Sequence, residues 1–293
     1  MKLDYEYLSK IRRAVSIYTK RKTSNVLDGD FHSVYRGRSM EFDDLKEYVY
    51  GDDVHDIDWK SSSRMSRILV RRYMADRRHN VMFIMDRGRQ FLGDTSKGEA
   101  KRELMLMTFG TLAYILGRNG ADFALSYPGD HSANTSFFKS GSEHLESLLY
   151  GYERNCTIDS AFSLNQTISE ILNSVHKRMI IFVVTDMDGI AKLSEELIKT
   201  ITINNDLLII NIDDAFLTGD MVYDNEQGFY EKFFVSHNKA LRKEEEKIRW
   251  EILSNASQIC KRSRAAMTTI AAEEDIIGST IALIERYKHG YYG

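Results

Sequence analysis

Residues 81–86 read VMFIMD, a short apolar run that ends in an aspartate. Further runs of this kind follow at Phe123–Ser126, Met179–Val184, Leu207–Ile212 and, more weakly, Ala266–Ile270. Longer polar or periodic stretches separate these runs, which is typical of strands buried on both faces of a parallel sheet. We therefore predict an α/β domain whose parallel sheet is covered by helices.

The stretches between the runs favour helices and one hairpin. Glu99–Leu116 has apolar side chains at helical spacing, and Gly117 and Gly120 mark its end. Residues 126–138, SYPGDHSANTSFF, hold the only proline and a Gly-Asp pair, which predicts a hairpin. Further helices are expected at residues 142–150, 167–175, 239–262 and 275–287.

The first 80 residues differ from the rest in pattern and charge. They carry 17 Lys and Arg against 13 Asp and Glu, a balance of +4, whereas residues 81–293 carry 23 against 30, a balance of −7. Residues 3–17 have the spacing of an amphipathic helix, and the glycines that follow punctuate short β-like pieces. We predict two domains, a small β-containing N-terminal module over residues 1–78 and the parallel-sheet domain over residues 79–293. The expected apolar side of the N-terminal helix consists of Leu8, Ile11, Val15 and Tyr18.

Composition narrows the class of protein. The longest apolar runs are interrupted or far shorter than the roughly 20 residues that a membrane span needs. The N-terminal segment is amphipathic and carries acids, unlike a signal peptide. We therefore expect a cytoplasmic protein without a membrane span. Cys156 and Cys260 are the only cysteines and form no CxxC pair, which predicts reduced, structural thiols.

Basic residues gather between Lys60 and Arg78, with Asp76 as the one acid among them. Such a cluster is compatible with nucleic-acid binding. The alternative is that its arginines pair with the acids of the preceding segment GDDVHDID, because bidentate Arg–carboxylate pairs use the same side chains. We favour pairing and do not expect a nucleic-acid partner. The arginines between the two ends are Arg64, Arg67, Arg71, Arg72 and Arg77.

A long ordered motif precedes the first strand. Its features are Gly29, Arg36–Gly37, Glu41–Phe42, Tyr48, Gly51–Asp53, Ile57–Trp59 and Arg64. With these residues the chain strongly resembles the bacterial family catalogued as domain of unknown function fifty-eight, whose members are commonly encoded beside MoxR-type AAA+ ATPases. The strand–helix order of residues 81–293 resembles the von Willebrand factor A-like domain of that family, so the resemblance covers nearly the whole chain.

The resemblance implies a fold and a class of partner but no reaction. It implies a von Willebrand factor A-like sheet flanked by helices, in the soluble subtype of the family. It also implies a non-enzymatic accessory factor that acts with the ATPase on a client protein that the sequence does not identify.

Von Willebrand factor A-like domains often bind Mg²⁺ through a D-x-S-x-S loop, a distant Thr and a distant Asp. The corresponding loop here reads Asp86-Arg87-Gly88-Arg89-Gln90. Asp86 matches, both hydroxyls are missing, and two arginines would stand beside any cation. Thr157 and Asp186 are the best matches for the distant Thr and Asp, with Asp188 in reserve. A hard cation needs about six oxygens, so we disfavour a metal at Asp86, Thr157 and Asp186 and expect no cofactor.

The alternative is that Asp86 and Asp186 pair with Arg87 or Arg89, or cap neighbouring helices. In that case Arg87 and Arg89 are expected to grip a carboxylate of the partner without a metal. The predicted protein-binding residues are therefore Asp86, Arg87, Gly88, Arg89, Gln90, Thr157 and Asp186.

The acids around His55 are the one place where a hydrolase centre could be drawn. Their spacing matches neither a calcium loop nor a two-histidine zinc motif. We predict instead an interlock in which Asp53 and Asp58 meet arginines such as Arg36 or Arg64 while Trp59 is buried. The predicted structural set is Arg36, Glu41, Asp52, Asp53, Asp58, Trp59 and Arg64.

Three functions therefore remain open. The favoured one is a protein-binding accessory of a MoxR-type AAA+ ATPase. The second is a metal-dependent hydrolase that uses the acids between Asp52 and Asp58, and the third is a nucleic-acid binder that uses Lys60–Arg78.

Overall fold

The structure is a computed structural model that describes residues 8–13, 15, 42–50, 52, 54–73, 80–232, 235 and 238–292. Its contacts divide the chain into two compact units, one formed by Met1–Asp30 with His79–Gly293 and the other by Phe31–Arg78. The sequence placed residues 1–30 with the small module, and that division into domains stays a prediction. Sequence features that lie outside the described residues are Tyr18, Gly29, Arg36, Gly37, Glu41, Gly51, Asp53, Asp76 and Arg77.

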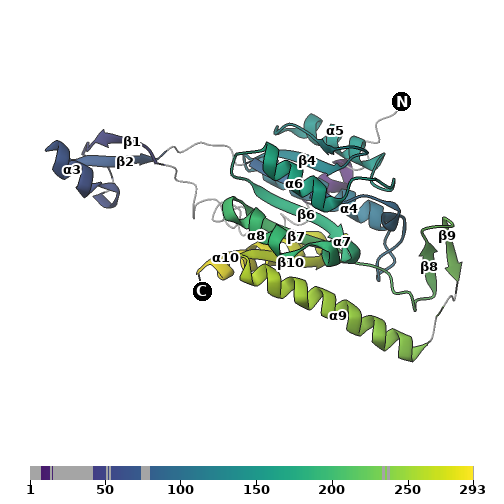
Figure 1. The fold of residues 1–293 in the computed structure, drawn as a ribbon. Helices are drawn as coiled ribbons and strands as arrows, with labels where there is room; N and C mark the ends of the chain where they lie inside the picture. The colour runs from purple at the N-terminus through teal and green to yellow at the C-terminus, as the bar shows by residue number, and fades with distance from the viewer. Residues whose placement is uncertain are drawn as a thin grey trace. The chain divides into compact units, whose positions relative to one another are not determined.

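A six-stranded sheet forms the centre of the larger unit (Figure 1). Its strands are β3 (Asn80–Met85), β4 (Asp122–Pro128), β5 (Ala133–Thr135), β6 (Ile180–Asp186), β7 (Asp206–Ile212) and β10 (Ala265–Ile270). The strand order is β10-β7-β6-β3-β4-β5, and all neighbours are parallel except β5, which is antiparallel to β4. The predicted parallel α/β sheet and the predicted hairpin are both confirmed.

Burial explains why the central strands are uniformly apolar. Every residue of β6 and β7 is buried, because helices cover both faces of the sheet and leave no solvent side for alternating polar residues. The register sets Val81 beside Ile180, and Ile180 beside Asp206. The strands therefore run side by side and finish at one common edge.

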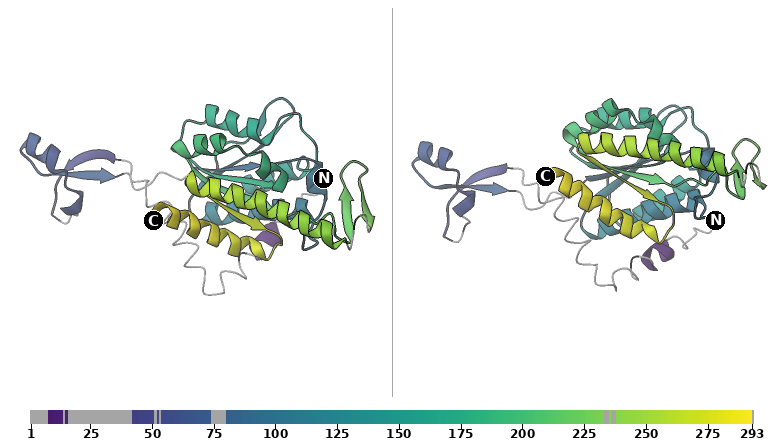
Figure 2. Two further views of the ribbon diagram at one scale, coloured as in Figure 1. Left: turned by 60° about the horizontal axis from the view of Figure 1, so that its bottom comes forward. Right: turned by 90° about the horizontal axis from the view of Figure 1, so that it is seen from below.

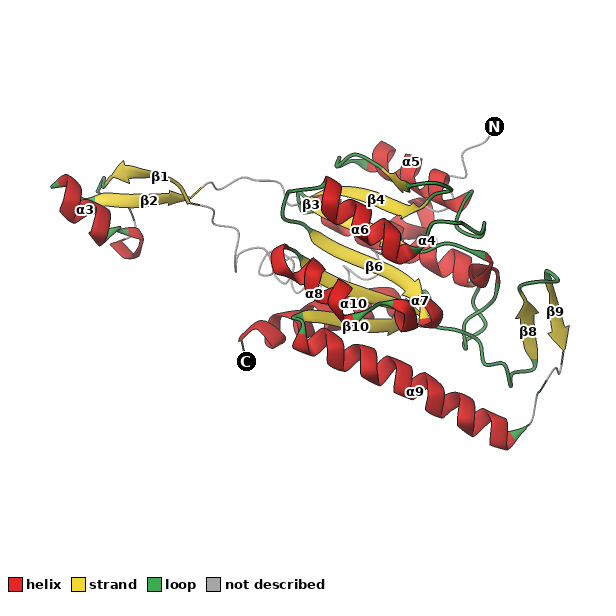
Figure 3. Ribbon diagram, in the orientation of Figure 1, coloured by secondary structure: helices red, strands yellow, loops and turns green. Residues whose placement is uncertain are grey.

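Besides the N-terminal helical residues 8–13, seven helices in the described part of the larger unit surround this sheet (Figure 3). They are α4 (Lys101–Arg118), α5 (Ser142–Glu153), α6 (Leu164–Ser174), α7 (Met187–Lys192), α8 (Glu195–Asn204), α9 (Lys239–Arg262) and α10 (Asp275–Tyr292). A short 3-10 helix, η2 (Arg89–Leu92), follows β3. The sequence predicted α4, α5, α6, α9 and α10, whereas α7 and α8 were not predicted.

The helices form two layers, one on each face of the sheet (Figure 2). Ile168 of α6, Ile198 of α8 and Cys260 of α9 share one core cluster with strand residues such as Val183. On the opposite face, α4 and α10 pack on the sheet and on each other. There Phe83 of β3 lies edge-on to Phe109 of α4, with ring centroids 5.0 Å apart.

The N-terminal helical residues 8–13 and 15 pack on α4. Leu8, Ile11 and Val15 are buried, as their predicted apolar side requires. A Cβ at Gly110 of α4 would lie only 2.4 Å from Ile11 Cδ1. Gly110 therefore allows the close approach of the two segments.

The segment between β7 and α9 forms a small hairpin, β8 (Met221–Asp224) with β9 (Phe229–Lys232). Tyr230 of β9 donates its hydroxyl to Asp94 at 3.0 Å. On α9, the guanidinium groups of Arg242 and Arg249 lie over the ring of Phe216, 3.2 and 4.0 Å from its centroid. These contacts hold the long charged helix and the hairpin segment to the body of the unit.

The smaller unit contains β1 (Phe42–Glu47), η1 (Val54–Asp56), α3 (Trp59–Met65) and β2 (Leu69–Tyr73). β1 and β2 pair antiparallel. Asp58 caps α3 by accepting a hydrogen bond from Ser61 N at 2.9 Å, and the hydroxyl of Ser62 accepts one from Leu69 N at 2.8 Å. None of the described helices combines the length and hydropathy needed to cross a membrane.

Candidate functional site

Three aspartates meet at the carboxyl edge of the large sheet. Asp86 directly follows β3, Asp186 ends β6, and Asp214 lies two residues after β7. These strands are neighbours and parallel, so their carboxyl ends share one edge, which is where open α/β sheets bind ligands. Asp86 N donates to Val184 O at 2.9 Å, which joins the start of the β3 loop to β6.

Asp86 is buried and fully engaged. Its Oδ2 accepts the hydroxyl of Thr185 at 2.6 Å, and its Oδ1 accepts the backbone N–H of Arg87 at 2.8 Å. The fully buried Tyr152 donates its hydroxyl to the backbone carbonyl of Asp86. Burial raises the pKa of Asp86 to about 6, although the hydrogen bond from Thr185 works in the opposite direction.

Asp186 pairs with a lysine that sequence reasoning did not select. Lys101, the first residue of α4, is only 2% exposed, and its Nζ lies 2.8 Å from Asp186 Oδ2. The same ammonium forms a second ion pair with Asp214. Burial acts to lower the pKa of Lys101, but the two carboxylates outweigh it and the pKa is raised. The ammonium therefore stays charged at neutral pH.

The other oxygen of Asp186 caps α7. Oδ1 accepts a hydrogen bond from Gly189 N at 3.1 Å. A Cβ at Gly189 would lie 1.8 Å from Thr185 Oγ1 and 2.9 Å from Asp86 Oδ2. Glycine at this position therefore brings the first turn of α7 against both carboxylates.

In the loop that follows β3, the two positions without a hydroxyl are Gly88 and Gln90, and the Gln90 side chain occupies the space beside Gly88. Gly88 has φ of +142°, and a Cβ there would lie 2.1 Å from Gln90 Oε1. The Gln90 side chain turns back over Gly88 and donates to Arg87 O at 3.3 Å. Gly88 and Gln90 are thus a matched pair in which one residue makes room for the other.

Arg87 and Arg89 have different environments. The side chain of Arg87 is 3% exposed, and its Nη2 donates to Asp130 at 3.0 Å and to Asp159 O at 3.1 Å. Arg89 is 57% exposed, and its side chain pairs with Asp159 at 3.2 Å. The arginines therefore do not pair with Asp86 or Asp186, because both reach acids on other loops. The other part of the prediction, that these aspartates cap neighbouring helices, is confirmed for Asp186, which caps α7.

The loop containing Thr157 lies against the β3 loop. Gly88 N donates to Cys156 O at 2.9 Å, and Arg89 N donates to Asp159 Oδ1 at 2.9 Å. Thr157 is half-buried within this loop. The sequence analysis placed Thr157 in the same site as the Asp86–Gln90 loop, and the fold brings these two loops together.

Only part of the predicted binding set can touch a partner directly. Asp86, Arg87, Gly88 and Asp186 are buried, and Gln90 and Thr157 are half-buried. Arg89 is the exposed member of the set. Around it lie the exposed side chains of Asp130, Ile158 and Asp159, and we call these four residues the edge surface.

The residues at this edge do not fit a divalent metal. Both oxygens of Asp86 and both oxygens of Asp186 already accept hydrogen bonds or an ion pair. The described residues contain no group of three or more His, Cys, Asp or Glu side chains arranged to hold a metal ion. A hard cation needs about six oxygens, and a buried ammonium beside Asp186 repels it.

The acids of the smaller unit are engaged locally. Asp52 pairs with Lys46 at 2.7 Å and accepts from Val49 N at 3.0 Å. These contacts hold the pKa of Asp52 below its usual value, the Lys46 hydrogen bond most of all. Asp58 is the helix cap of α3, and Arg36, Glu41 and Asp53 of the predicted set lie outside the described residues.

Trp59 is 68% exposed, so its predicted burial is wrong. The physical reason is that the described residues of this unit form only a two-stranded ribbon and short helices, which offer no second layer to cover an indole. Arg64 is exposed, and Arg67 forms an exposed ion pair with Glu47 at 2.6 Å. Arg67 thus pairs with an acid, but Glu47 lies outside the segment GDDVHDID in which the sequence placed the partners of these arginines.

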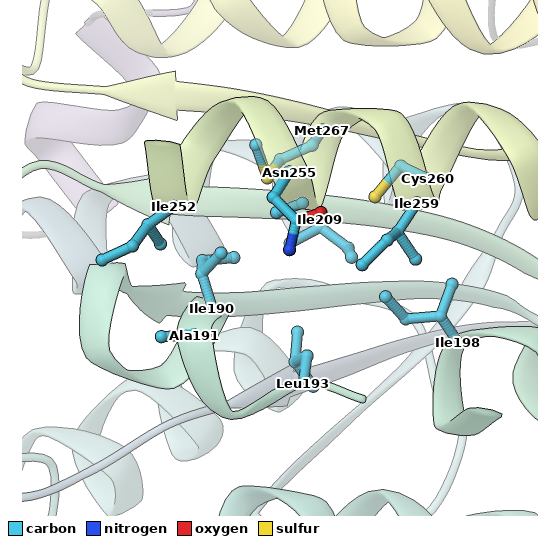
Figure 4. Close-up of a pocket in the computed structure, with 11 residues that line it drawn as sticks. Ile190, Ala191, Leu193, Ile198, Ile209, Ile252, Asn255, Ile259, Cys260 and Met267 are labelled. Atoms are coloured by element: carbon cyan, nitrogen blue, oxygen red, sulfur yellow. The ribbon is translucent and has the colours of Figure 1, made fainter. Parts of the chain in front are cut away.

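An apolar cavity lies away from the sheet edge, between α9, α7, α8 and the sheet (Figure 4). Its volume is about 130 Å³, and Asn255 is its one polar side chain other than the Cys260 thiol. Burial raises the pKa of Cys260 to about 12 and that of Cys156 to about 11. Both thiols are therefore protonated at neutral pH. Only Cys260 lines the cavity, and none of the lining side chains is charged.

Comparison with known proteins places this geometry in a family. The family model described as "Protein of unknown function DUF58" matches residues 44–247. The uncharacterized proteins Rv1480 of Mycobacterium tuberculosis and Mb1516 of Mycobacterium bovis are each 23% identical to the chain over 147 residues. That alignment covers 50% of this chain and 46% of the relative, so the chain spans about half the length of the curated relatives it matches.

Solved structures with similarity to the chain include three of low identity. A von Willebrand factor type A protein from Catenulispora acidiphila is 7% identical, with a TM-score of 0.37 over 72% of this chain and 42% of that one. The PilB minor pilin from Streptococcus sanguinis is 10% identical, with a TM-score of 0.46 over 76% and 64%. The SpRpn10 VWA domain is 12% identical, with a TM-score of 0.38 over 70% and 97%.

The family match spans well over half of the chain and includes part of the motif before β3, the sheet edge and the first nine residues of α9. The chain belongs to the family described as protein of unknown function DUF58.

Proposed function

We propose that the chain is a non-enzymatic, protein-binding accessory factor that works with a MoxR-type AAA+ ATPase in the maturation or assembly of other proteins. The observation that carries the proposal is the closed charge network at the carboxyl edge of the sheet. Asp86, Asp186 and Lys101 are all buried and paired with groups of the same chain. A catalytic group must reach its substrate, whereas these groups are used to hold the loops in place.

The edge surface supports binding to a protein. Ile158 is 52% exposed beside the charged side chains of Arg89, Asp130 and Asp159. An apolar side chain among fixed charges of both signs suits a protein partner with complementary charges. The charges are held by main-chain and side-chain contacts, which lowers the entropy that binding would otherwise lose.

The proposed contact with the partner's carboxylate differs from the sequence prediction in the role of Arg87. Arg87 was expected to grip a partner carboxylate together with Arg89. Arg87 is buried and already bound to Asp130 and Asp159 O, so in the proposal it positions the loop. Arg89 is then the side chain that meets the partner's carboxylate.

Charge reversal tests the proposal. Purified full chain and the MoxR-type ATPase encoded with it are titrated by calorimetry, using Arg89→Glu and Asp159→Arg at the edge surface. We expect each to weaken binding by about tenfold, the size expected for a charged hydrogen bond that is partly shielded from water. The matched control is Lys177→Glu, which reverses an exposed charge close to the start of β6, at the opposite edge of the sheet.

Two results would contradict the proposal in different ways. No binding of the wild-type chain to the ATPase would remove the proposed partner. Binding that is weakened by Lys177→Glu and unchanged by both edge variants would remove the proposed surface.

A further inference from the structure

A buried lysine is built into the acidic edge of the sheet. Of the lysines whose burial the structure describes, Lys101 is the one whose side chain is buried. Its ammonium forms ion pairs with Asp186 and Asp214, and it lies 5.0 Å from the ring centroid of Phe91. The partners come from the ends of β6 and β7, so one side chain spans two strands.

The position of Lys101 is unfavourable on local grounds. It is the first residue of α4, and the N-terminus of a helix carries a partial positive charge that disfavours a cation. Removing an ammonium from water costs further free energy. The two carboxylates, with the ring of Phe91, offset these costs. The acids that the ammonium neutralises therefore account for a lysine at this position.

Those acids include one that the sequence named as a candidate ligand of a disfavoured metal site. Asp186 is the match to the distant aspartate of a von Willebrand factor A-like Mg²⁺ site, and its Oδ2 is occupied by the ammonium. The missing hydroxyls at Gly88 and Gln90 agree with this arrangement, because the Gln90 side chain fills that part of the loop.

We infer that the Lys101 ammonium is a tethered cation that replaces a divalent metal ion as the neutralising charge at this edge. The edge is then held in one conformation by a covalently attached charge. Its geometry does not depend on the concentration of Mg²⁺ or Ca²⁺. This inference concerns the isolated chain and does not require the proposed partner.

The test is thermal unfolding of the isolated full chain with millimolar Mg²⁺, with Mn²⁺ and with EDTA. The variants are Lys101→Met, which keeps the length of the side chain and removes its charge, and Lys101→Met combined with Asp186→Asn and Asp214→Asn. Lys192→Met is the matched control, because Lys192 also pairs with an aspartate near this edge but is exposed.

We expect the melting temperature of the wild-type chain to be the same in all three solutions. Lys101→Met should lower it by roughly 10 °C, since an uncompensated carboxylate is left buried. The triple variant should regain at least half of that loss, and Lys192→Met should change the melting temperature little.

Stabilisation of the wild-type chain by Mg²⁺ or Mn²⁺ by several degrees would overturn the inference. It would also be overturned by a Lys101→Met variant that is as stable as Lys192→Met. If Lys101→Met does not fold, the triple variant decides: a folded triple variant supports the inference, and an unfolded one shows that packing rather than charge is lost. None of these readouts depends on the ATPase, so failure here and failure of the proposed function are distinguishable.

Discussion

The larger unit is expected to lose stability as the pH rises, because the buried Asp86 must ionise. Replacement of Asp86 by Asn should remove this loss. Asp86 is 7% exposed, and burial raises the pKa of its carboxyl group from the usual 3.8 to about 6. The native state therefore holds this proton at pH values where the unfolded chain has lost it. The free energy of unfolding falls as the pH rises from about 4 through about 6, and this contribution is constant above that range.

The magnitude follows from the two pKa values. They differ by about 2 units, and each unit corresponds to about 1.36 kcal/mol, so the ionised group costs about 3 kcal/mol at neutral pH. The hydroxyl of Thr185, which donates to the ionised carboxylate at 2.6 Å, keeps this cost from being larger.

The assay is urea unfolding of the wild-type chain and of Asp86→Asn between about pH 4 and pH 8. The difference between the two free energies is the quantity to follow, because other titrating groups largely cancel in it. We expect that difference to move by about 3 kcal/mol in favour of the Asn variant as the pH rises. In a Thr185→Val background the shift should be larger, since the hydrogen bond that favours ionisation is gone.

A difference that does not change with pH would refute the reasoning from burial. A difference in the free energy of unfolding that moves in favour of the wild-type chain as the pH rises would have a different meaning. It would mean that the native state stabilises the ionised carboxylate, as a bound cation would.

Gly189→Ala should destabilise the chain by roughly 1–3 kcal/mol, because the added methyl group would overlap Thr185 Oγ1. Thermal unfolding beside Gly278→Ala, a helical glycine with nothing within 4 Å of its Cβ position, measures this, and equal effects would contradict the close approach. Asp58→Ala should cost about 1 kcal/mol as the loss of a helix cap. Hydrogen exchange at Ser61 N–H reports it, and Asp58→Asn, which keeps the acceptor, should retain protection; equal loss in both variants would count against the cap.

The strands were predictable because their signal is local. A strand buried on both faces is apolar at every position, so β3, β6 and β7 stand out as uninterrupted runs. α7 was missed because it has only six residues, too few to repeat a helical period clearly. α8 has ten residues but buries only Ile198 and Ile201, so its apolar pattern is weak. Their capping residues, Asp186 and Ser194, were the available signal.

The β8–β9 hairpin was missed for a related reason. Each strand has four residues, and β9 is mostly exposed. Short exposed strands show neither continuous apolar character nor clear alternation. Their pairing is visible only after the chain has brought them together.

At the candidate site, the sequence identified Asp86 and Asp186 because each stands at the end of a strand, and parallel strands end together. Lys101 gave no such signal, since it stands among charged residues at the start of a helix, where lysines are normally solvated. The orientation of Arg87 was equally hidden, because its partner Asp130 lies 43 positions away, after β4.

The sequence by itself determined which segments are buried strands, which longer segments are helices, and that two aspartates share one edge of the sheet. Each of these follows from periodicity or from the geometry of parallel strands. Only the tertiary structure decided which charges neutralise each other. Lys101 meets Asp186 and Asp214 across 85 and 113 positions of the chain. Such pairs depend on strand order and on where α4 begins relative to the sheet edge. Charges interact according to their distance in space, and the local sequence pattern does not reveal the distance between the ammonium and the carboxylates.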